Sequence, residues 1–354
     1  MMAAGGRRGA ALTGDDRSPF PAEGLRHDAL LYDHDRDYLD GIRDFVAAGR
    51  AADEPVLVAV PTHRLPLVQP VLDGLGGVEL ADMAVIGRNP AAIIPTALRD
   101  FVDRFPGRRL RIVGESLWPG RPSVAYRHCM EHEAVLNVAL ADRPVTARCL
   151  FDRSGLPAAA LACVGHTHPW LVSGGVARIS RDYQRPESVL DQLTRPLPAP
   201  PRDAVTVLVE PAGLAALRAT VATVGSAAGL TEERVDDLRI AVTELASNAL
   251  THGAGPATAR CWVERGELLC EVSGRGELTD PLAGRIPPPR DGVRGRGLLL
   301  VHQLCDLVDV HTADGVTTIR LHLDLDRDPL PPAIPVPRSA PGATQNGFAL
   351  APPL

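Results

Sequence analysis

The sequence contains no lysine, so all 37 of its basic residues are arginine. This absence excludes the phosphate-binding lysine of a P-loop, a Schiff-base lysine and the ATP-binding lysine of the common protein-kinase fold. Aromatic residues make up only 4% of the chain, and the net charge is −6. Neither a basic patch nor a series of stacking aromatics therefore indicates direct binding of nucleic acid.

Long apolar segments are scarce as well. The longest apolar run, around residues 156–164, is about half as long as a membrane span. The N-terminus has no apolar segment of signal-peptide length. The six cysteines form no CxxC pair and show no regular spacing, which is typical of a protein in a reducing compartment. We therefore expect a cytoplasmic protein without membrane contact.

Glycine and proline are abundant, with 33 residues each, and they mark the boundaries of the chain's segments. A length of 354 residues is enough for two domains. We expect a disordered N-terminus at 1–25, a first domain at 26–183, a proline-rich linker at 184–203, a second domain at 204–326 and a disordered tail at 327–354.

The first domain shows alternating strand and helix patterns. Residues 55–60 (PVLVAV) form a continuous apolar run, which is typical of a buried parallel strand. Further strands are expected at 27–33, 83–86, 109–114 and 145–151, and helices at 38–48, 65–75, 93–105 and 125–141. This alternation predicts an α/β fold with a parallel sheet and helices on its faces.

The second domain contains a long amphipathic helix. It begins after Thr231, a good N-cap residue, and ends at Gly253. Glu244, Asn248 and His252 are spaced four residues apart and share one face. The Asn248 oxygen suits Mg²⁺, and Glu244 can orient or deprotonate an attacking hydroxyl group. The alternative is an ordinary solvated helix face.

A glycine-rich segment precedes another helix of the second domain, expected at 296–306. Its sequence is Arg-Gly-Arg-Gly at 294–297. Glycines at the start of a helix let backbone N–H groups approach an anion, and the helix dipole favours phosphate there. Glycine is also common at loop–helix junctions that bind nothing, so this segment alone does not establish a phosphate site.

In this order, the segments ELASNALTHG (244–253) and GRGLLLV (295–301) resemble the GHKL, or Bergerat, ATPase superfamily, in its branch of anti-sigma-factor serine/threonine kinases. The resemblance covers about 203–325 and implies a mixed-sheet α/β sandwich with helices on one face. It implies bound ATP, with Asn248 on its Mg²⁺ and Glu244 as catalytic base. The remaining nucleotide-binding residues that it implies are His252, Gly276, Gly295 and Gly297, under a mobile lid at about 277–294.

The sequence departs from this family at the first glycine box, Asp-x-Gly, whose aspartate accepts a hydrogen bond from the adenine amino group. The segment here is VSGRG, 272–276, so either Gly274 or Val272 stands at the aspartate position. Neither side chain can accept that bond, and an unpaired donor in a buried pocket costs about 1–3 kcal/mol. We therefore expect weakened ATP binding, and we expect Gly274→Asp to tighten it.

The first domain resembles the MEDS sensory family. The similar stretches are HDALLYD (27–33), EPVLVAVP (54–61), GRNPAAIIP (87–95), GESLWPGR (114–121) and HEAVLN (132–137). The resemblance implies a RecA-like, ligand-binding sensory domain. Glu115, Trp118, His132 and Glu133 lie in these stretches and are candidates for a small sensory pocket. The alternative is that they satisfy a buried turn and the core.

A zinc site is a weaker hypothesis for the first domain. His128 and His132 lie four residues apart on one predicted helix, with Cys129 beside them, and this spacing can ligate zinc. Two or three ligands on a single helix do not close a site. His166 and His168 could add ligands, although solvated loop histidines are the simpler interpretation.

Two functions remain open at this stage. The first is an enzyme: a transcriptional regulator whose kinase-like domain uses ATP and Mg²⁺ to phosphorylate an anti-anti-sigma (STAS-type) protein and binds a sigma factor, under control of the sensory domain. The second is a catalytically silent module that binds such partners without ATP turnover. Gly274 or Val272 favours the silent module, and the Glu244–Asn248 pair favours the enzyme. We expect neither direct nucleic-acid nor membrane contact, and homodimerisation would fit the family.

Overall fold

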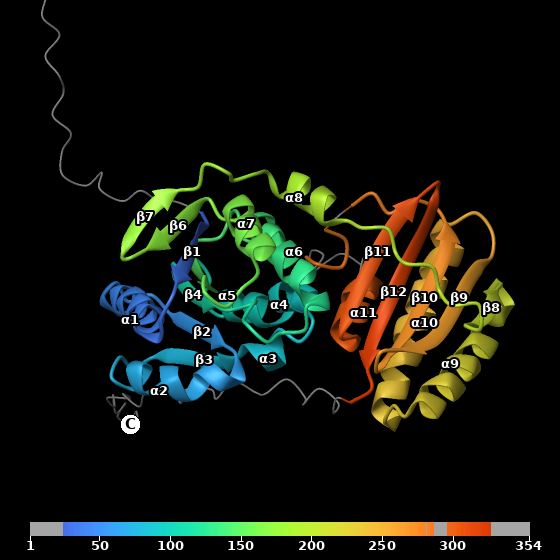
Figure 1. The fold of residues 1–354 in the computed structure, drawn as a ribbon. Coiled ribbons are helices and arrows are strands. Elements are labelled where there is room, and N and C mark those ends of the chain that lie inside the picture. Colours follow the sequence, from blue (N-terminus) through green and yellow to red (C-terminus); the bar gives the residue numbers. More distant parts are fainter. Residues whose placement is uncertain (1–23, 281, 287–295, 327–354) are drawn as a thin grey trace, which may run out of the picture.

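The computed structural model describes residues 24–280, 282–286 and 296–326. The chain forms two α/β domains that lie side by side, the first coloured blue to green and the second yellow to red (Figure 1). The termini that we expect to be disordered lie outside the described residues, apart from 24 and 25. Within the described residues, no helix is long and apolar enough to cross a membrane.

The first domain is built on a sheet with the strand order β3-β2-β4-β5-β1-β6-β7. Its strands are β1 (Arg26–Tyr32), β2 (Val56–Val60), β3 (Val78–Asp82), β4 (Leu110–Gly114), β5 (Val145–Asp152), β6 (Trp170–Ser173) and β7 (Val176–Ile179). The described pairings are parallel except for the β6–β7 hairpin. The predicted parallel-sheet α/β domain is confirmed.

Helices cover both faces of this sheet. One face carries α1 (Asp35–Ala51) and α2 (Leu65–Asp73). The other carries α4 (Pro90–Ile93), a π-helical turn (Ile94–Leu98), α5 (Arg99–Asp103), α6 (Val124–Ala139) and α8 (Pro186–Leu193); α7 (Ala158–Thr167) packs beside α6. The apolar run of β2 serves both faces, because Val58 enters one core and Leu57 enters the other.

Two predictions for this domain differ from the structure. Residues 83–86, expected as a strand, are the short helix α3 (Met83–Ile86), because the Asp82 carboxylate caps it by accepting a hydrogen bond from the Ala84 N–H at 2.8 Å. The strand lies just before it, at the half-buried sheet edge, where β3 needs no continuous apolar run. The predicted linker begins with helix α8, which buries Val189 and Leu190.

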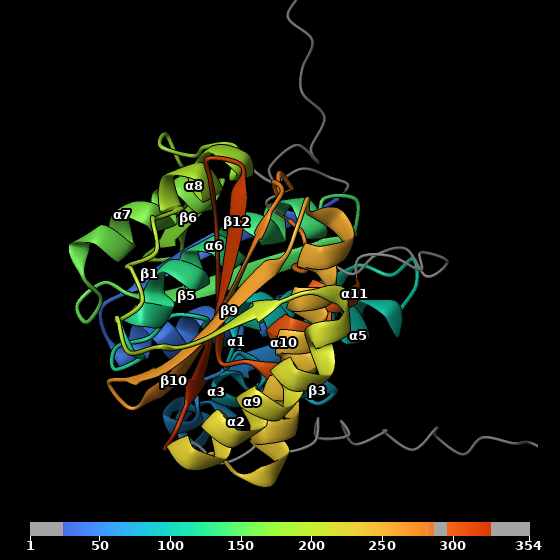
Figure 2. The same cartoon turned by 90° about the vertical axis from the view of Figure 1, so that its right-hand side faces the viewer.

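The second domain has a five-stranded sheet with the order β11-β12-β10-β9-β8. The strands are β8 (Val205–Val209), β9 (Ala257–Glu264), β10 (Glu267–Arg275), β11 (Leu307–Ala313) and β12 (Val316–Asp324). Helices α9 (Leu214–Ala228), α10 (Glu232–His252) and α11 (Arg296–Leu304) lie on one face of it (Figure 2). The predicted α/β sandwich is confirmed, but its described pairings are all antiparallel rather than mixed.

Alternation along β12 separates an apolar face from a polar one. Leu321 and Leu323 are fully buried under the helices, whereas Arg320 and His322 point to the opposite face. Arg320 donates to the Glu271 carboxylate at 2.7 Å and to the Pro198 carbonyl at 2.6 Å. The linker is thereby held against the polar face of the sheet.

Helix α11 and the residues just after it contact the first domain. Asn89 donates from its amide to the His302 carbonyl at 2.8 Å and to the Cys305 carbonyl at 3.1 Å. The buried Asp306 carboxylate is paired with Arg88 of the first domain and with Arg234 of α10, the latter at 2.6 Å. Asp306 therefore has one partner across the interface and one within its own domain, and Asn89 is satisfied across the interface.

Arg234 tests how much this buried pairing contributes to stability. Its side chain is 1% exposed and also donates to the Leu304 carbonyl at 2.8 Å. We expect Arg234→Ala to lower the free energy of unfolding by roughly 3 kcal/mol, because it removes one partner of a buried ion pair. Arg239→Ala is the matched control on the same helix: its pair with Asp236 is exposed and is expected to contribute less than about 1 kcal/mol. Urea unfolding of the full chain measures both; equal losses would contradict the prediction.

Candidate functional site

Helix α10 places the predicted catalytic residues on one side of a cavity. Its Thr231 hydroxyl accepts a hydrogen bond from the Arg234 N–H at 3.4 Å, so the predicted N-cap is confirmed. Leu238, Val242 and Leu245 are buried against the sheet. This orientation leaves Glu244 and Asn248 half-buried on another face of the helix.

The start of α11 meets this face. A side chain at Gly297 would place its Cβ 2.8 Å from Glu244 Oε2 and 3.2 Å from Asn248 Nδ2. A Cβ at this position would occupy the space directly in front of both polar groups, so any other residue would displace the ends of their side chains. The two segments that the sequence singles out, 244–253 and 295–301, are thus brought together by the fold; Gly295 itself lies outside the described residues.

A cavity of about 760 Å³ opens beside these residues, a size typical of ligand pockets. Of the predicted nucleotide-binding residues, Asn248, His252, Gly276 and Gly297 line it. Glu244 does not contribute to the lining, but lies next to it at Gly297. The cavity therefore contains the residues that the sequence assigns to Mg²⁺ and phosphate.

Packing decides between the two alternatives for the missing aspartate. A Cβ at Gly274 would lie 2.7 Å from the Ala249 Cβ of α10, so no side chain fits there unless the helix shifts. The packing therefore argues against Gly274→Asp as a way to restore the base contact, because the new side chain would first have to displace α10. Val272 precedes it by two residues on the same face of β10 and also lines the cavity. Val272 is the position at which an acidic side chain would face a bound base.

Thr317 is a cavity residue that the sequence reasoning missed. It pairs with Gly274 across the sheet and lines the cavity. Its hydroxyl group donates to the Gly276 carbonyl at 2.9 Å and accepts from the Leu278 N–H at 3.1 Å. Thr317 thereby fixes the chain where it leaves β10. The alternation of β12 could have indicated it, since Thr317 shares a face with Leu321.

The described part of the predicted lid, which we call the lid stem (277–280 and 282–286), connects the cavity to the first domain. Leu282 and Ile286 line the cavity and also pack against the core of the first domain. Between them, Arg285 donates to the Glu131 carboxylate of α6 at 2.7 Å. The rest of the predicted lid, 287–294, lies outside the described residues.

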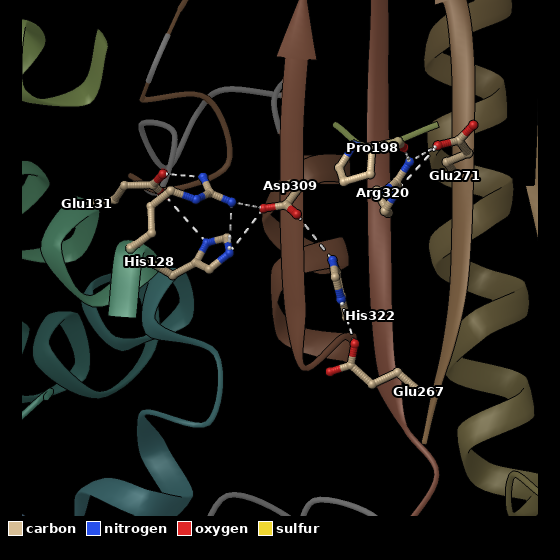
Figure 3. A network of polar contacts seen from close by, with 9 residues as sticks. His128, Glu131, Pro198, Glu267, Glu271, Asp309, Arg320 and His322 are labelled. Atoms are coloured by element: carbon tan, nitrogen blue, oxygen red, sulfur yellow. Dashed lines mark hydrogen bonds and ion pairs between the residues drawn. The ribbon is translucent and has the colours of Figure 1, made fainter. Parts of the chain in front are cut away.

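A polar network continues from α6 across the sheet of the second domain (Figure 3). Asp309 of β11 is paired with Arg127, lies 3.1 Å from His128 Nε2 and lies 3.2 Å from His322 Nε2. Burial alone would raise the pKa of Asp309, but the hydrogen bonds with His128 and His322 hold it well below its usual range. Burial likewise opposes a charged His322, but its bonds to Asp309 and Glu267 raise its pKa to about 9.

The candidate sensory residues occupy different environments. Glu115 is buried and accepts hydrogen bonds from the hydroxyl groups of Tyr32 and Tyr38, both at 2.9 Å. Its burial raises its pKa to about 7, against the effect of these bonds. Trp118 lies under the Arg121 guanidinium, 4.6 Å from the ring centre. Glu115 and Trp118 therefore have partners within the protein itself, as expected if they satisfy a buried turn instead of lining a sensory pocket.

His132 and Glu133 lie apart from this pair. Both line a small cavity of about 20 Å³, whose lining among the described residues includes neither Glu115 nor Trp118. Burial lowers the pKa of His132 to about 4. The spacing argument for zinc is not supported, because His128 turns to Asp309 and the Cys129 thiol donates to the Ser116 carbonyl at 3.2 Å.

An antiparallel sheet covered on one face by helices, with a glycine-flanked cavity beside the middle helix, defines an ATPase-type α/β sandwich. Residues 207–323 match the family model of the histidine kinase-like ATPase domain. Residues 26–169 match that of the MEthanogen/methylotroph, DcmR Sensory domain, abbreviated MEDS. The chain thus joins a MEDS sensory domain to a histidine kinase-like ATPase domain.

Among solved structures, the chain is similar to the RsbU and RsbW domains of Rv1364c from Mycobacterium tuberculosis, with 16% sequence identity and a TM-score of 0.28. The match covers 59% of this chain, which spans 50% of the other chain's length. No curated protein matches the sequence.

Val272→Asp tests the missing base contact. We expect it to tighten ATP binding by roughly tenfold to a hundredfold, because the new carboxylate supplies an acceptor worth about 1–3 kcal/mol. Val272 is 3% exposed but lines the cavity, so the carboxylate would be directed to a bound base rather than to bulk solvent. Calorimetric titration of the full chain with Mg-ATP measures the affinity.

Val272→Thr, which keeps the shape without adding a carboxylate, is the control. Unchanged affinity in a Val272→Asp protein with native circular dichroism would show that base recognition does not depend on this position.

Proposed function

We propose that this chain is a regulatory serine/threonine protein kinase of the anti-sigma type, which uses ATP and Mg²⁺ and is controlled by its sensory domain. Its proposed partners are a sigma factor, which it binds, and an anti-anti-sigma (STAS-type) protein, which it phosphorylates. The observation that carries the proposal is the meeting of Glu244, Asn248 and Gly297 at one end of the cavity.

The residues at this end fit the phosphates of a nucleotide. Gly297 leaves a space next to Glu244 and Asn248 that any Cβ would fill, and it belongs to the N-terminal turn of α11, where a helix favours anions. Mg-ATP, when bound, supplies the phosphoryl group that is transferred. The Asn248 side-chain oxygen would hold the Mg²⁺ that accompanies the nucleotide. Glu244 Oε2 accepts the proton of the attacking serine hydroxyl.

The opposite end of the cavity favours a second candidate function. There Val272 presents an apolar wall where the related kinases have an aspartate. A chain with this wall could keep the fold and bind a sigma factor or an anti-anti-sigma protein without ATP turnover. The two candidates differ in whether Mg-ATP binds at working concentration.

Titration of the full chain with Mg-ATP decides between them. We expect micromolar binding that Asn248→Ala abolishes, because the Mg²⁺ ligand is lost. Ser247→Ala, one residue away on another face of α10, is expected to change nothing. Glu244→Ala is expected to retain binding but to lose phosphoryl transfer to the partner protein. An absence of heat at millimolar ATP would overturn the kinase and leave the silent module.

The contact between Glu131 and Arg285 is our proposal for how the first domain controls the cavity. Arg285 belongs to the lid stem, and Glu131 is the buried acceptor that anchors it to α6. We expect Glu131→Gln to weaken Mg-ATP binding by about fivefold or more, within the usual range of coupling between sites. Stopped-flow measurement is expected to show faster nucleotide release.

Glu79→Gln is the matched control for this prediction. It neutralises another carboxylate of the same domain, whose partner Arg104 belongs to the first domain and not to the lid stem. If both variants bind Mg-ATP like the unmodified chain, the lid stem is not under the control of α6.

A further inference from the structure

Inside the first domain, four side chains from separate elements converge on one point. They are His27 of β1, Glu133 of α6, Cys149 of β5, and His168, which follows α7. Their candidate ligand atoms all lie within 4.8 Å of one another. Each side chain is at least nine-tenths buried. The cluster is remote from the nucleotide cavity and has no role in the function proposed above.

The two histidines of the cluster each form a hydrogen bond through Nδ1, the ring nitrogen that faces away from the other cluster residues. These bonds indicate which nitrogen of each ring carries the hydrogen atom. His168 Nδ1 lies 3.0 Å from the Val164 carbonyl, which can only accept, so this nitrogen carries the proton. His27 Nδ1 lies 3.0 Å from Asn137 Oδ1. The Asn137 amide donates to the Glu133 and Thr167 carbonyls, so its oxygen is the acceptor for His27. Both rings therefore donate from Nδ1 and direct Nε2 inward, where a neutral imidazole presents a lone pair.

The Cys149 thiol can donate its proton to His27 Nε2 at 3.3 Å, whereas the other two inward-facing atoms have no such donor in the described part of the chain. His168 Nε2 lies 3.4 Å from Glu133 Oε2, and both atoms are buried without a hydrogen-bond partner among the described residues. Glu133 Oε1 already accepts from the Ser116 hydroxyl at 2.5 Å. Two acceptors that face each other in a dry interior are unfavourable unless a cation lies between them.

The spacing of these atoms matches a tetrahedral metal site. His27 Nε2 lies 3.3 Å from Cys149 Sγ and 3.5 Å from Glu133 Oε2. Bonds of about 2.0–2.3 Å from a central zinc ion place neighbouring ligands at about 3.4 Å from each other. The small cavity of about 20 Å³ is lined in part by Glu133 and Cys149. The carbonyl and amide partners of the imidazoles are those that orient metal-bound histidines.

We propose that His27, Glu133, Cys149 and His168 bind a divalent transition metal of the zinc class in a closed, four-coordinate site. Two imidazoles and a thiol exclude Mg²⁺ and Ca²⁺, which require oxygen ligands, and favour Zn²⁺. On binding, the Cys149 thiol releases its proton to solvent, and the thiolate forms the metal–sulfur bond. The ion joins β1, β5, α6 and the segment after α7, and so fixes α6 against the sheet.

Metal analysis and Co²⁺ substitution of the full chain test this proposal. We expect the purified protein to contain close to one equivalent of zinc. After chelation, Co²⁺ titration is expected to give a thiolate-to-cobalt absorption band in the near ultraviolet and the intense visible bands of a tetrahedral site. X-ray absorption of the zinc-loaded protein is expected to show one sulfur and three nitrogen or oxygen neighbours, without the need for any variant.

Cys149→Ser is expected to abolish the thiolate band and to weaken Co²⁺ binding more than tenfold. Cys163→Ser, a half-buried cysteine outside the cluster, is the matched control and is expected to keep both. A zinc-free protein that gives no cobalt spectrum would overturn the proposal. So would a sulfur-free coordination shell, or a thiolate band that persists in Cys149→Ser and disappears in Cys163→Ser.

Discussion

Buried carboxylates at the interface between the two domains need partners from both sides, and Glu131 is the one that holds the lid stem. A buried carboxylate is strongly unfavourable unless cations and donors surround it. Burial would raise the pKa of Glu131, but Arg285 and His128 hold it well below its usual range. Because Arg285 belongs to the lid stem, part of this compensation comes from the second domain. Charge compensation therefore holds a wall of the nucleotide cavity against α6.

Helix α6 carries two buried carboxylates that face different surroundings. Glu131 faces the second domain, and Glu133, about 200° further round the helix, faces the four-residue cluster inside the first domain. A helix moves as a rigid element, so a change that displaces Glu133 also displaces Glu131. The connection from the interior of the sensory domain to the lid stem is thus one helix long and needs no chain of intermediate contacts.

The elements that sequence patterns predict well are those whose burial is either continuous, as in β2, or follows the helical period, as in α10. The apolar run of β2 and the long amphipathic helix α10 lie as expected, and the capping residue Thr231 marks the start of α10. The edge strand β3 was missed because its residues are only half-buried. Residues 83–86 form a short apolar run, which is typical of a strand. They are nevertheless helical, and Asp82 is the N-cap residue of that helix.

The candidate site could be predicted only where its residues are neighbours in the sequence. Glu244 and Asn248 share a helix face, and their spacing alone brings them together. The choice between Val272 and Gly274 depends on the distance from β10 to Ala249, which no motif contains. The cluster of His27, Cys149 and His168 depends on the order in which parallel strands pair, so no spacing along the chain reveals it.

The residues that line the cavity differ in polarity between its two ends. This difference affects how far the first domain can influence the affinity for a nucleotide. Under the proposed function, Gly297 and Asn248 would meet the phosphates of a nucleotide, whereas the Val272 side chain would offer no polar contact to its base. Where the base contributes little, a larger share of any nucleotide's binding free energy must come from the walls that close over it. Among these walls are Leu282 and Ile286, which pack against the first domain. A ligand can shift a conformational equilibrium only by its differential affinity for the two states. If α6 controls the lid stem as proposed, an apolar residue at position 272 would increase the fraction of the nucleotide affinity that α6 can influence.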